Sequence, residues 1–275
     1  GVARHAWNWG LDLCKKILDY NRENPDEKLK FPSAIDLHKF LVKWVKVENP
    51  WYYEVSKTSP QYALRHLSTA FSDFFRQKTN NARRVGFPRF KKKGQHDSFT
   101  LEGTIKIEHR SVQLPKLGIL KTYERLPQRL APKTAIVSRT ADRWFISFSY
   151  EIEPIPTVKM LSVVGVDLGI KTLATLSTNE TFPNPQPYRK SQSRLARLQK
   201  SASRKVKGSK NRHKANLKVA KLSCRTANIR KDTLNKLTTH LAKNHSQVAI
   251  EDLNVSGMMA NHCLAKSIAD LGLYE

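Results

Sequence analysis

Two short apolar runs that each stop at a carboxylate constrain this chain most. The first, VVGVDLGIK at residues 163–171, breaks at Asp167, and the second, VAIEDL at residues 248–253, breaks at Glu251. A short β-branched run that ends on an acid is typical of a buried strand that carries the acid to the rim of a sheet. Two such acids side by side are the minimum set of ligands for a divalent metal ion. The pair therefore predicts an α/β fold with a candidate metal site at Asp167 and Glu251.

The neighbouring residues refine the choice of acids. Gly165 and Gly169 would let a substrate backbone approach Asp167 closely, because glycine has no Cβ. Asp252 should face away from Glu251, since side chains alternate along a strand, and we interpret it as structural. Hydrolysis with two metal ions needs more than two carboxylates. Asp270 is a candidate for the third, but nothing in the sequence places it beside the other two, and we interpret it as structural as well.

The charge balance indicates the kind of partner. The 275 residues include 49 Lys and Arg against 23 Asp and Glu, a formal net charge of +26. Such a charge usually has a polyanionic partner, and nucleic acid fits best because binding to phosphates releases counterions. A membrane surface is the alternative, weakened by the lack of a transmembrane-length apolar run and of an evident basic amphipathic anchor. We expect no membrane partner.

The cysteines and the opening residues indicate the compartment. Cys14, Cys224 and Cys263 lie far apart with no CxxC spacing, which indicates free thiols in a reducing compartment and no zinc site in this stretch. No secretory signal pattern is visible at the start. The sequence therefore predicts a cytoplasmic protein.

The first of three compositional zones, residues 1–82, is predicted to be helical. Apolar residues recur at three and four spacing over residues 7–18 and again over residues 36–44, with Ser33 as the expected N-cap. A third helix is expected over residues 60–75. We interpret this zone as one helical domain.

The second zone, residues 83–157, is predicted to consist of short strands. Residues 134–139 and 143–150 bracket a short turn, which is typical of a β-hairpin. Several short strands over about 70 residues are typical of a small barrel or a sandwich.

The third zone, residues 158–275, is predicted to be α/β. It contains the two acid-ended strands and, between them, a long helical stretch over residues 188–244. Glycine and serine at residues 207–209 form a natural break, so two antiparallel helices are expected.

These expected helices carry most of the excess charge. Between Tyr188 and His245 there are eighteen Lys and Arg and a single acid, Asp232, a balance of +17. A solvated helix normally mixes charges of both signs, so we interpret this stretch as an arm that contacts phosphates without specifying base sequence. The contacts are assigned to Arg189, Lys190, Arg194, Arg197, Lys200, Arg204, Lys205, Lys207, Lys210 and Arg212.

A second, shorter basic cluster opens the β zone. Its phenylalanines, Phe87 and Phe90, would either stack on bases or anchor the loop, and the sequence leaves both open. The predicted phosphate contacts here are Arg83, Arg84, Arg89, Lys91, Lys92 and Lys93.

Several of these motifs resemble one known family. The strings VGVDLGIKTLA at residues 164–174 and VAIEDLNVS at residues 248–256 resemble the RuvC-type nuclease core of the TnpB (OrfB) proteins of insertion sequences. The strings WNWGL at residues 7–11, FPRFKKK at residues 87–93 and YRK at residues 188–190 resemble the same family, as does the ending NHCLAK at residues 261–266. The resemblance covers nearly the whole chain.

The resemblance implies a fold and an activity. It implies a helical recognition domain, a small β-barrel and an RNase H-like core that holds the long basic helical hairpin, and kinship to type V CRISPR effectors. It also implies Mg²⁺-dependent cleavage of target double-stranded DNA directed by a non-coding guide RNA that derives from the transposon end. Asp167 and Glu251 take the positions of the family's first two catalytic acids. The host would be bacterial or archaeal.

The resemblance also implies what lies outside this stretch. The family has a first β-strand ahead of the Trp7 helix, and its third acid lies beyond a zinc-binding module with two CxxC pairs. We therefore expect a fragment with an incomplete nuclease core, and Zn²⁺ only in the missing module. The alternatives are a catalytically inactive nucleic-acid-binding protein and a nuclease that selects DNA structure without a guide.

Overall fold

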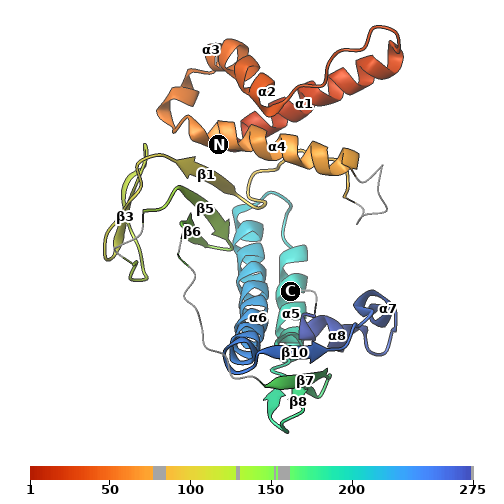
Figure 1. Cartoon of the computed structure of the whole chain (residues 1–275). Helices are drawn as coiled ribbons and strands as arrows, with labels where there is room; N and C mark the ends of the chain where they lie inside the picture. Colours follow the sequence, from red (N-terminus) through yellow and green to blue (C-terminus); the bar gives the residue numbers. More distant parts are fainter. Residues whose placement is uncertain (77–84, 128–130, 152, 154–161, 274–275) are drawn as a thin grey trace. The chain divides into compact units, whose positions relative to one another are not determined.

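The computed structural model describes residues 1–76, 85–127, 131–151, 153 and 162–273. Contacts group the chain into two units, Gly1–Ile152 and Glu153–Glu275. The first unit contains the helical region and two small sheets, and the second is a mixed α/β unit (Figure 1). The expected division into three domains stays a prediction.

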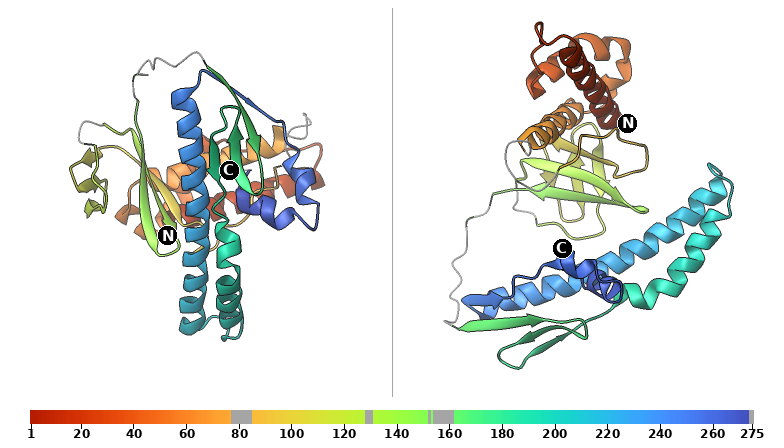
Figure 2. Two further views of the ribbon diagram at one scale, coloured as in Figure 1. Left: turned by 90° about the horizontal axis from the view of Figure 1, so that it is seen from below. Right: turned by 90° about the vertical axis from the view of Figure 1, so that its right-hand side faces the viewer.

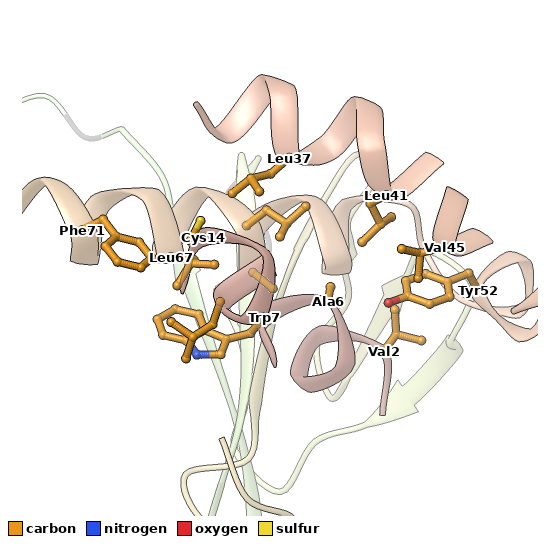
Figure 3. Packing of buried hydrophobic residues seen from close by; sticks show 13 residues of the cluster. Val2, Ala6, Trp7, Cys14, Leu37, Leu41, Val45, Tyr52, Leu67 and Phe71 are labelled. Atoms are coloured by element: carbon orange, nitrogen blue, oxygen red, sulfur yellow. The ribbon is translucent and has the colours of Figure 1, made fainter. Parts of the chain in front are cut away.

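The helices of the first unit pack through apolar residues that recur every three or four residues along the sequence. α1 (Val2–Glu23) lies against α4 (Thr58–Arg76), and α2 (Ala34–Phe40) packs on both. Gly10 permits the close approach, because a Cβ there would lie 2.7 Å from Cδ2 of Leu64. Figure 3 shows the resulting core, which includes Ala6 and Cys14 of α1 and Leu37 of α2.

The start of α2 follows the sequence prediction. Ser33 accepts a hydrogen bond from the backbone N–H of Asp36, and the Asp36 carboxylate accepts one from the N–H of Ser33. This capping box pairs two N–H groups that the first turn of a helix leaves without partners.

Beyond α2 the helix continues further than expected. A π-helical turn (Leu41–Val45) leads into α3 (Lys46–Glu48), and a 3₁₀ turn (Pro50–Glu54) follows. A π-turn inserts one residue into the helical repeat and so rotates the side chains after it. In the turns that follow, Lys46 and Tyr52 are buried while Val47 and Tyr53 are exposed.

The strands of the first unit form two three-stranded antiparallel sheets. One has the order β1-β5-β6, from Ser98–Glu102, Thr134–Thr140 and Arg143–Ser149. The other has the order β2-β3-β4, from Lys106–Ile107, Ser111–Leu114 and Gly118–Lys121. Both contribute to one core, which contains Leu101, Val112, Leu114, Ala135 and Val137. In the part of the unit that the structure describes, these are two separate sheets and not one closed barrel.

The second unit is built on a four-stranded sheet with the order β10-β7-β8-β9. β7 (Val163–Leu168), β8 (Thr172–Leu176) and β9 (Thr181–Pro183) form an antiparallel meander, and β10 (Gln247–Ile250) is parallel to β7. Val164 and Val166 point into a core with Leu237 and Leu241 of the following long helix. β9 is not anticipated by the sequence pattern.

The basic stretch forms the two helices that the glycine break predicts. α5 (Pro187–Ser203) and α6 (Lys210–Asn244) run antiparallel and side by side (Figures 1 and 2). Ser209 caps α6 by accepting a hydrogen bond from the N–H of Arg212. Two short helices, α7 (Val255–Met259) and α8 (Ala265–Leu271), follow β10. Within the described ranges, no helix combines the length and apolar character that a membrane span requires.

Candidate functional site

The register of β7 and β10 brings the two predicted acids to the same level of the sheet. The parallel pairs run from Gln247 with Val163 to Ile250 with Val166. Glu251 directly follows the last pair, so the register places it beside Asp167 on the adjacent strand. Neighbouring strands lie about 4.8 Å apart, and paired residues of parallel strands point to the same face. The two carboxylates therefore share one face and one end of the sheet.

Alternation along β7 separates the core from this site. Val164 and Val166 are buried, and Gly165 and Asp167 occupy the opposite face. The exposed face is hollowed, and the hollow is lined by Gly165, Asp167 and Glu251 together with Thr175, Ser177 and their neighbours. Gly165 donates its N–H to the hydroxyl of Ser177 at 3.0 Å and accepts from the Ser177 N–H at 2.9 Å.

The electrostatics of this hollow favour a cation. Asp167 and Glu251 are both exposed, and neither carboxylate has an ion pair or hydrogen bond with another described residue. None of the described residues that line the hollow is Lys or Arg. Two carboxylates that line one hollow without a described counter-charge suit a hard divalent cation, which takes oxygen ligands. The described residues contain no group of three His, Cys, Asp or Glu that could hold a metal. The arrangement therefore fits part of a Mg²⁺ site.

Asp270 has a different role from the other acids. It is buried, and its two carboxylate oxygens accept the N–H groups of Tyr188 at 2.8 Å and Arg189 at 3.0 Å. These are the free donors of the first turn of α5, whose own N-cap residue, Gln186, provides no side-chain bond. A carboxylate at a helix N-terminus is stabilised by both the hydrogen bonds and the helix dipole. The structural interpretation of Asp270 is supported by these contacts.

Removing this cap should loosen the start of α5. Asp270→Ala is expected to lower the local stability of that turn by about 2 kcal/mol, since two charge-assisted bonds are lost in a buried setting. Hydrogen exchange of the amides of Tyr188 and Arg189 should then be about 30-fold faster, at about 1.4 kcal/mol for each factor of ten. The matched control is Asp252→Ala, an exposed acid, which should leave the exchange unchanged. Equal exchange in both variants would contradict the capping role.

The hairpin presents the predicted cations to solvent. Arg194, Arg197, Lys200 and Arg204 are exposed and make no ion pair with any described residue. Three of them, with Lys205, line a hollow near the end of α5. Arg212 differs, because its guanidinium donates to the carbonyl of Lys205 at 3.1 Å and so closes the loop between the helices. The remaining predicted contacts on the hairpin are Arg189, Lys190, Lys207 and Lys210, which are exposed.

Comparison with known proteins decides the family. The family model OrfB_IS605, described as "Probable transposase", matches residues 147–262, a range that includes both acids. The protein named "Putative RNA-guided DNA endonuclease InsQ" of Escherichia coli (strain K12) is 35% identical over 294 residues, which cover 100% of this chain and 70% of that protein. The chain belongs to this family.

Two further comparisons describe the extent of the match. A "Putative RNA-guided DNA endonuclease" of Streptomyces pristinaespiralis is 38% identical over 250 residues, which cover 88% of this chain, and the match spans 61% of that relative. The cryo-EM structure of a CRISPR-Cas12f ternary complex aligns with a TM-score of 0.29 at 11% identity, over 99% of this chain and 68% of that chain. At that score the alignment defines no shared fold.

In this OrfB-family chain the second basic cluster is held against α1. The Nε1–H of Trp7 donates to the carbonyl of Arg89 at 3.0 Å. Asn8 bonds both the N–H and the carbonyl of Lys91, at 2.8 and 3.0 Å. Phe87 packs edge-on against Phe71 and Phe74. This ring therefore anchors the segment, which supports the anchoring interpretation for Phe87.

The lysines of this cluster do not all have the same environment. The ammonium of Lys91 lies 3.9 Å from the centre of the Trp7 ring, and desolvation lowers the pKa of Lys91. Arg89, Lys91, Lys92 and Lys93 are all exposed and remain candidates for phosphate contacts, with the ammonium of Lys91 held over the Trp7 ring. Arg83 and Arg84 lie outside the described residues.

Proposed function

We propose that this chain carries most of an RNA-guided DNA endonuclease whose nuclease core is RNase H-like and of the RuvC type. The observation that carries the proposal is the position of Asp167 and Glu251 at one level of two adjacent parallel strands. An antiparallel meander followed by a helical crossover to a parallel strand agrees with such a core. The names of the family's relatives support the same activity.

The chemistry assigned to the site follows from its residues. Asp167 and Glu251 would hold Mg²⁺ through their carboxylate oxygens. Mg²⁺, when bound, activates water and stabilises the leaving oxygen of a phosphodiester. Gly165, which has no side chain, leaves room beside Asp167 for the substrate backbone. The catalytic role of both acids and the identity of the metal are parts of this proposal.

The exposed arginines and lysines would bind the nucleic acid. The α5–α6 hairpin, through exposed cations such as Arg194, Arg197, Lys200 and Arg204, would hold the guide RNA and its heteroduplex with target DNA by their backbones. Base pairing between guide and target would supply the sequence choice, so the protein needs no base-reading side chains there. The exposed Arg89, Lys92 and Lys93 would add contacts in the first unit.

The guide is tested most directly by the RNA that accompanies the protein. The chain purified from its host is expected to carry one defined non-coding RNA, identified by sequencing of the co-purified nucleic acid. A variant in which Arg194, Arg197, Lys200 and Arg204 are replaced by Gln should recover much less of that RNA. A random sample of cellular RNA would contradict the guide and favour a general nucleic-acid-binding protein.

A further inference from the structure

The hollow beside the acid pair contains two hydroxyl groups. Its volume is about 450 Å³, and of the described residues that line it only Thr175 and Ser177 carry a side-chain hydrogen-bond donor. The other polar side chains are the carboxylates of Asp167 and Glu251, which accept hydrogen bonds but do not donate them. A phosphodiester that enters the hollow therefore meets two negative charges and has two neutral donors available.

Ser177 extends the pairing between β7 and β8 by one step. β8 ends at Leu176, which pairs with Val166, so Ser177 lies opposite Gly165. The N–H of Ser177 donates to the carbonyl of Gly165 at 2.9 Å, and the N–H of Gly165 donates to the Ser177 hydroxyl at 3.0 Å. In a regular antiparallel pair the second bond would go to the backbone carbonyl of Ser177. The hydroxyl takes the place of that carbonyl where the chain leaves the sheet.

The bond from Gly165 limits the directions in which the hydroxyl hydrogen can point. A serine oxygen has one hydrogen and two lone pairs, and the N–H of Gly165 occupies one lone pair. Ser177 is exposed, lines the hollow and donates its hydroxyl hydrogen to no other described residue. The hydrogen is therefore available to a ligand in the hollow. Thr175 differs, because no hydrogen bond with a described residue orients its hydroxyl.

Gly165 keeps the space beside this hydroxyl open. A Cβ on Gly165 would lie 3.7 Å from Cβ and 3.9 Å from Oγ of Ser177, which is ordinary van der Waals contact. The φ of Gly165 also lies outside the left-handed region that favours glycine. Neither packing nor the backbone requires glycine here, although glycine weakens a strand. The room that it leaves in the hollow is the remaining reason for a glycine at this position.

Ser177 lies near the acid pair but not level with it. Asp167 pairs with Thr175, so Gly165 and Ser177 form the pair two residues further along the strands. Two residues of a strand span about 7 Å. A nucleic-acid strand with one phosphate at the acid pair would therefore place a neighbouring phosphate near the hydroxyl.

From these contacts we infer that Ser177 orients the substrate: its hydroxyl, held by the N–H of Gly165, donates a hydrogen bond to a non-bridging oxygen of the phosphate adjacent to the cleaved one. This bond aligns the DNA backbone over Asp167 and Glu251 and adds no positive charge beside them. The inference rests on the proposed function, because it assigns a further substrate contact to the same site.

Loss of the hydroxyl is expected to lower kcat/KM about 10-fold for Mg²⁺-dependent cleavage of DNA that matches the guide, since a hydrogen bond to a charged oxygen is lost. Ser177→Ala removes the donor. Ser177→Thr keeps it and should retain at least about a third of the wild-type kcat/KM. The matched control is Ser72→Ala, which removes an exposed hydroxyl of α4 that donates to the carbonyl of Ser68 at 3.0 Å. This control should leave kcat/KM unchanged.

A single sulfur in the substrate identifies the phosphate that Ser177 contacts. In one diastereomer of a synthetic DNA duplex, sulfur replaces the contacted oxygen of the phosphate adjacent to the cleaved one. The wild-type chain should cleave this duplex about 5- to 10-fold more slowly, since sulfur is a weak hydrogen-bond acceptor. The sulfur should not slow Ser177→Ala further, because the donor is already absent. Mn²⁺ in place of Mg²⁺ should not restore the wild-type rate, as it would if the sulfur had replaced a metal ligand.

Hydrogen exchange tests the local geometry without cleavage. Ser177→Ala should make the amide of Gly165 exchange about 10-fold faster, because the amide loses its acceptor. Ser177→Thr should keep the exchange near the wild-type rate. Unchanged exchange in Ser177→Ala would contradict the bond that orients the hydroxyl.

The outcomes separate this inference from the proposed function. Wild-type cleavage rates in Ser177→Ala, or an equal effect of the sulfur in the wild type and in this variant, would overturn the role of Ser177 alone. A Ser177→Thr variant as slow as Ser177→Ala would overturn it too, because the hydroxyl would not be the acting group. Restoration of the rate by Mn²⁺ would assign the oxygen to the metal and not to Ser177. A wild-type chain without Mg²⁺-dependent cleavage would instead reject the proposed function, on which this role rests.

Discussion

Replacing Asp167 by Asn is expected to lower the rate of Mg²⁺-dependent plasmid cleavage at least about 100-fold. Asn keeps the size of the side chain but removes the charge that would hold the proposed cation, and a metal ion contributes several kcal/mol to the transition state of phosphodiester cleavage. The measurement is the rate of linear product with the guide RNA bound. It is made with this chain, which spans 70% of its E. coli relative.

The second acid of the pair and one neighbouring acid, Asp252, which does not line the hollow, extend this test. Glu251→Gln should cause a loss of the same size, and the double variant little more, because both acids serve one site. Asp252→Asn, one residue further along, should retain cleavage, as alternation turns it away from Glu251. Since Asp167 and Glu251 are exposed and unpaired among the described residues, neither change should lower the melting temperature. Cleavage that survives Asp167→Asn would contradict the site assignment.

The acid pair could be predicted from sequence because the residues just before each acid identify it. Asp167 and Glu251 each end a β-branched run, and both runs are strands within a residue or two of the predicted limits. The register that places the two acids side by side cannot be derived from the residues next to them. It depends on a parallel pairing across the whole α5–α6 crossover, which only the assembled sheet determines.

The role of Asp270 could not be derived in the same way. Its sequence context shows only an acid in the last turn of a helix, an unfavourable position with the helix dipole. The N-terminus that it caps lies 82 residues earlier, at Tyr188. The sequence contains one clue, because the N-cap of α5 is Gln186 and not Ser, Thr, Asp or Asn. The lack of such a residue indicates that another part of the chain caps α5, but it does not indicate which part.

Lys46 is the clearest case of a residue that sequence reasoning missed. In the string LVKWVKVE at residues 41–48 it has the spacing of a solvated helical lysine. The π-turn at Leu41–Val45 shifts the helical phase, and the following turns then cover it. Trp7 shows the same limit, since its apolar position predicts burial but not its bond to the carbonyl of Arg89. Both depend on tertiary contacts.

The other large effect is expected from the hairpin. Replacing Arg194, Arg197, Lys200 and Arg204 by Gln should reduce the salt slope of RNA binding by about 3 and the affinity at 0.1 M salt by about 100-fold. Each phosphate contact contributes about 0.7 to 0.9 to the slope, and these four side chains have no competing partner among the described residues. Gln is a good helix former, so the loss should not come from unfolding of α5. Fluorescence anisotropy over a salt series measures both quantities.

A variant with the same change in net charge separates phosphate contacts from the general field of the protein. Lys28, Lys30, Lys39 and Lys43 are exposed lysines of the first unit, and their replacement by Gln also removes four charges. If the hairpin holds the nucleic acid, this control should change the slope by less than about 1, since only bound phosphates release counterions. An equal loss in both variants would mean that the +26 charge acts as a diffuse field. The α5–α6 hairpin would then have no specific role in binding nucleic acid. The proposed role of Asp167 and Glu251 would not be affected.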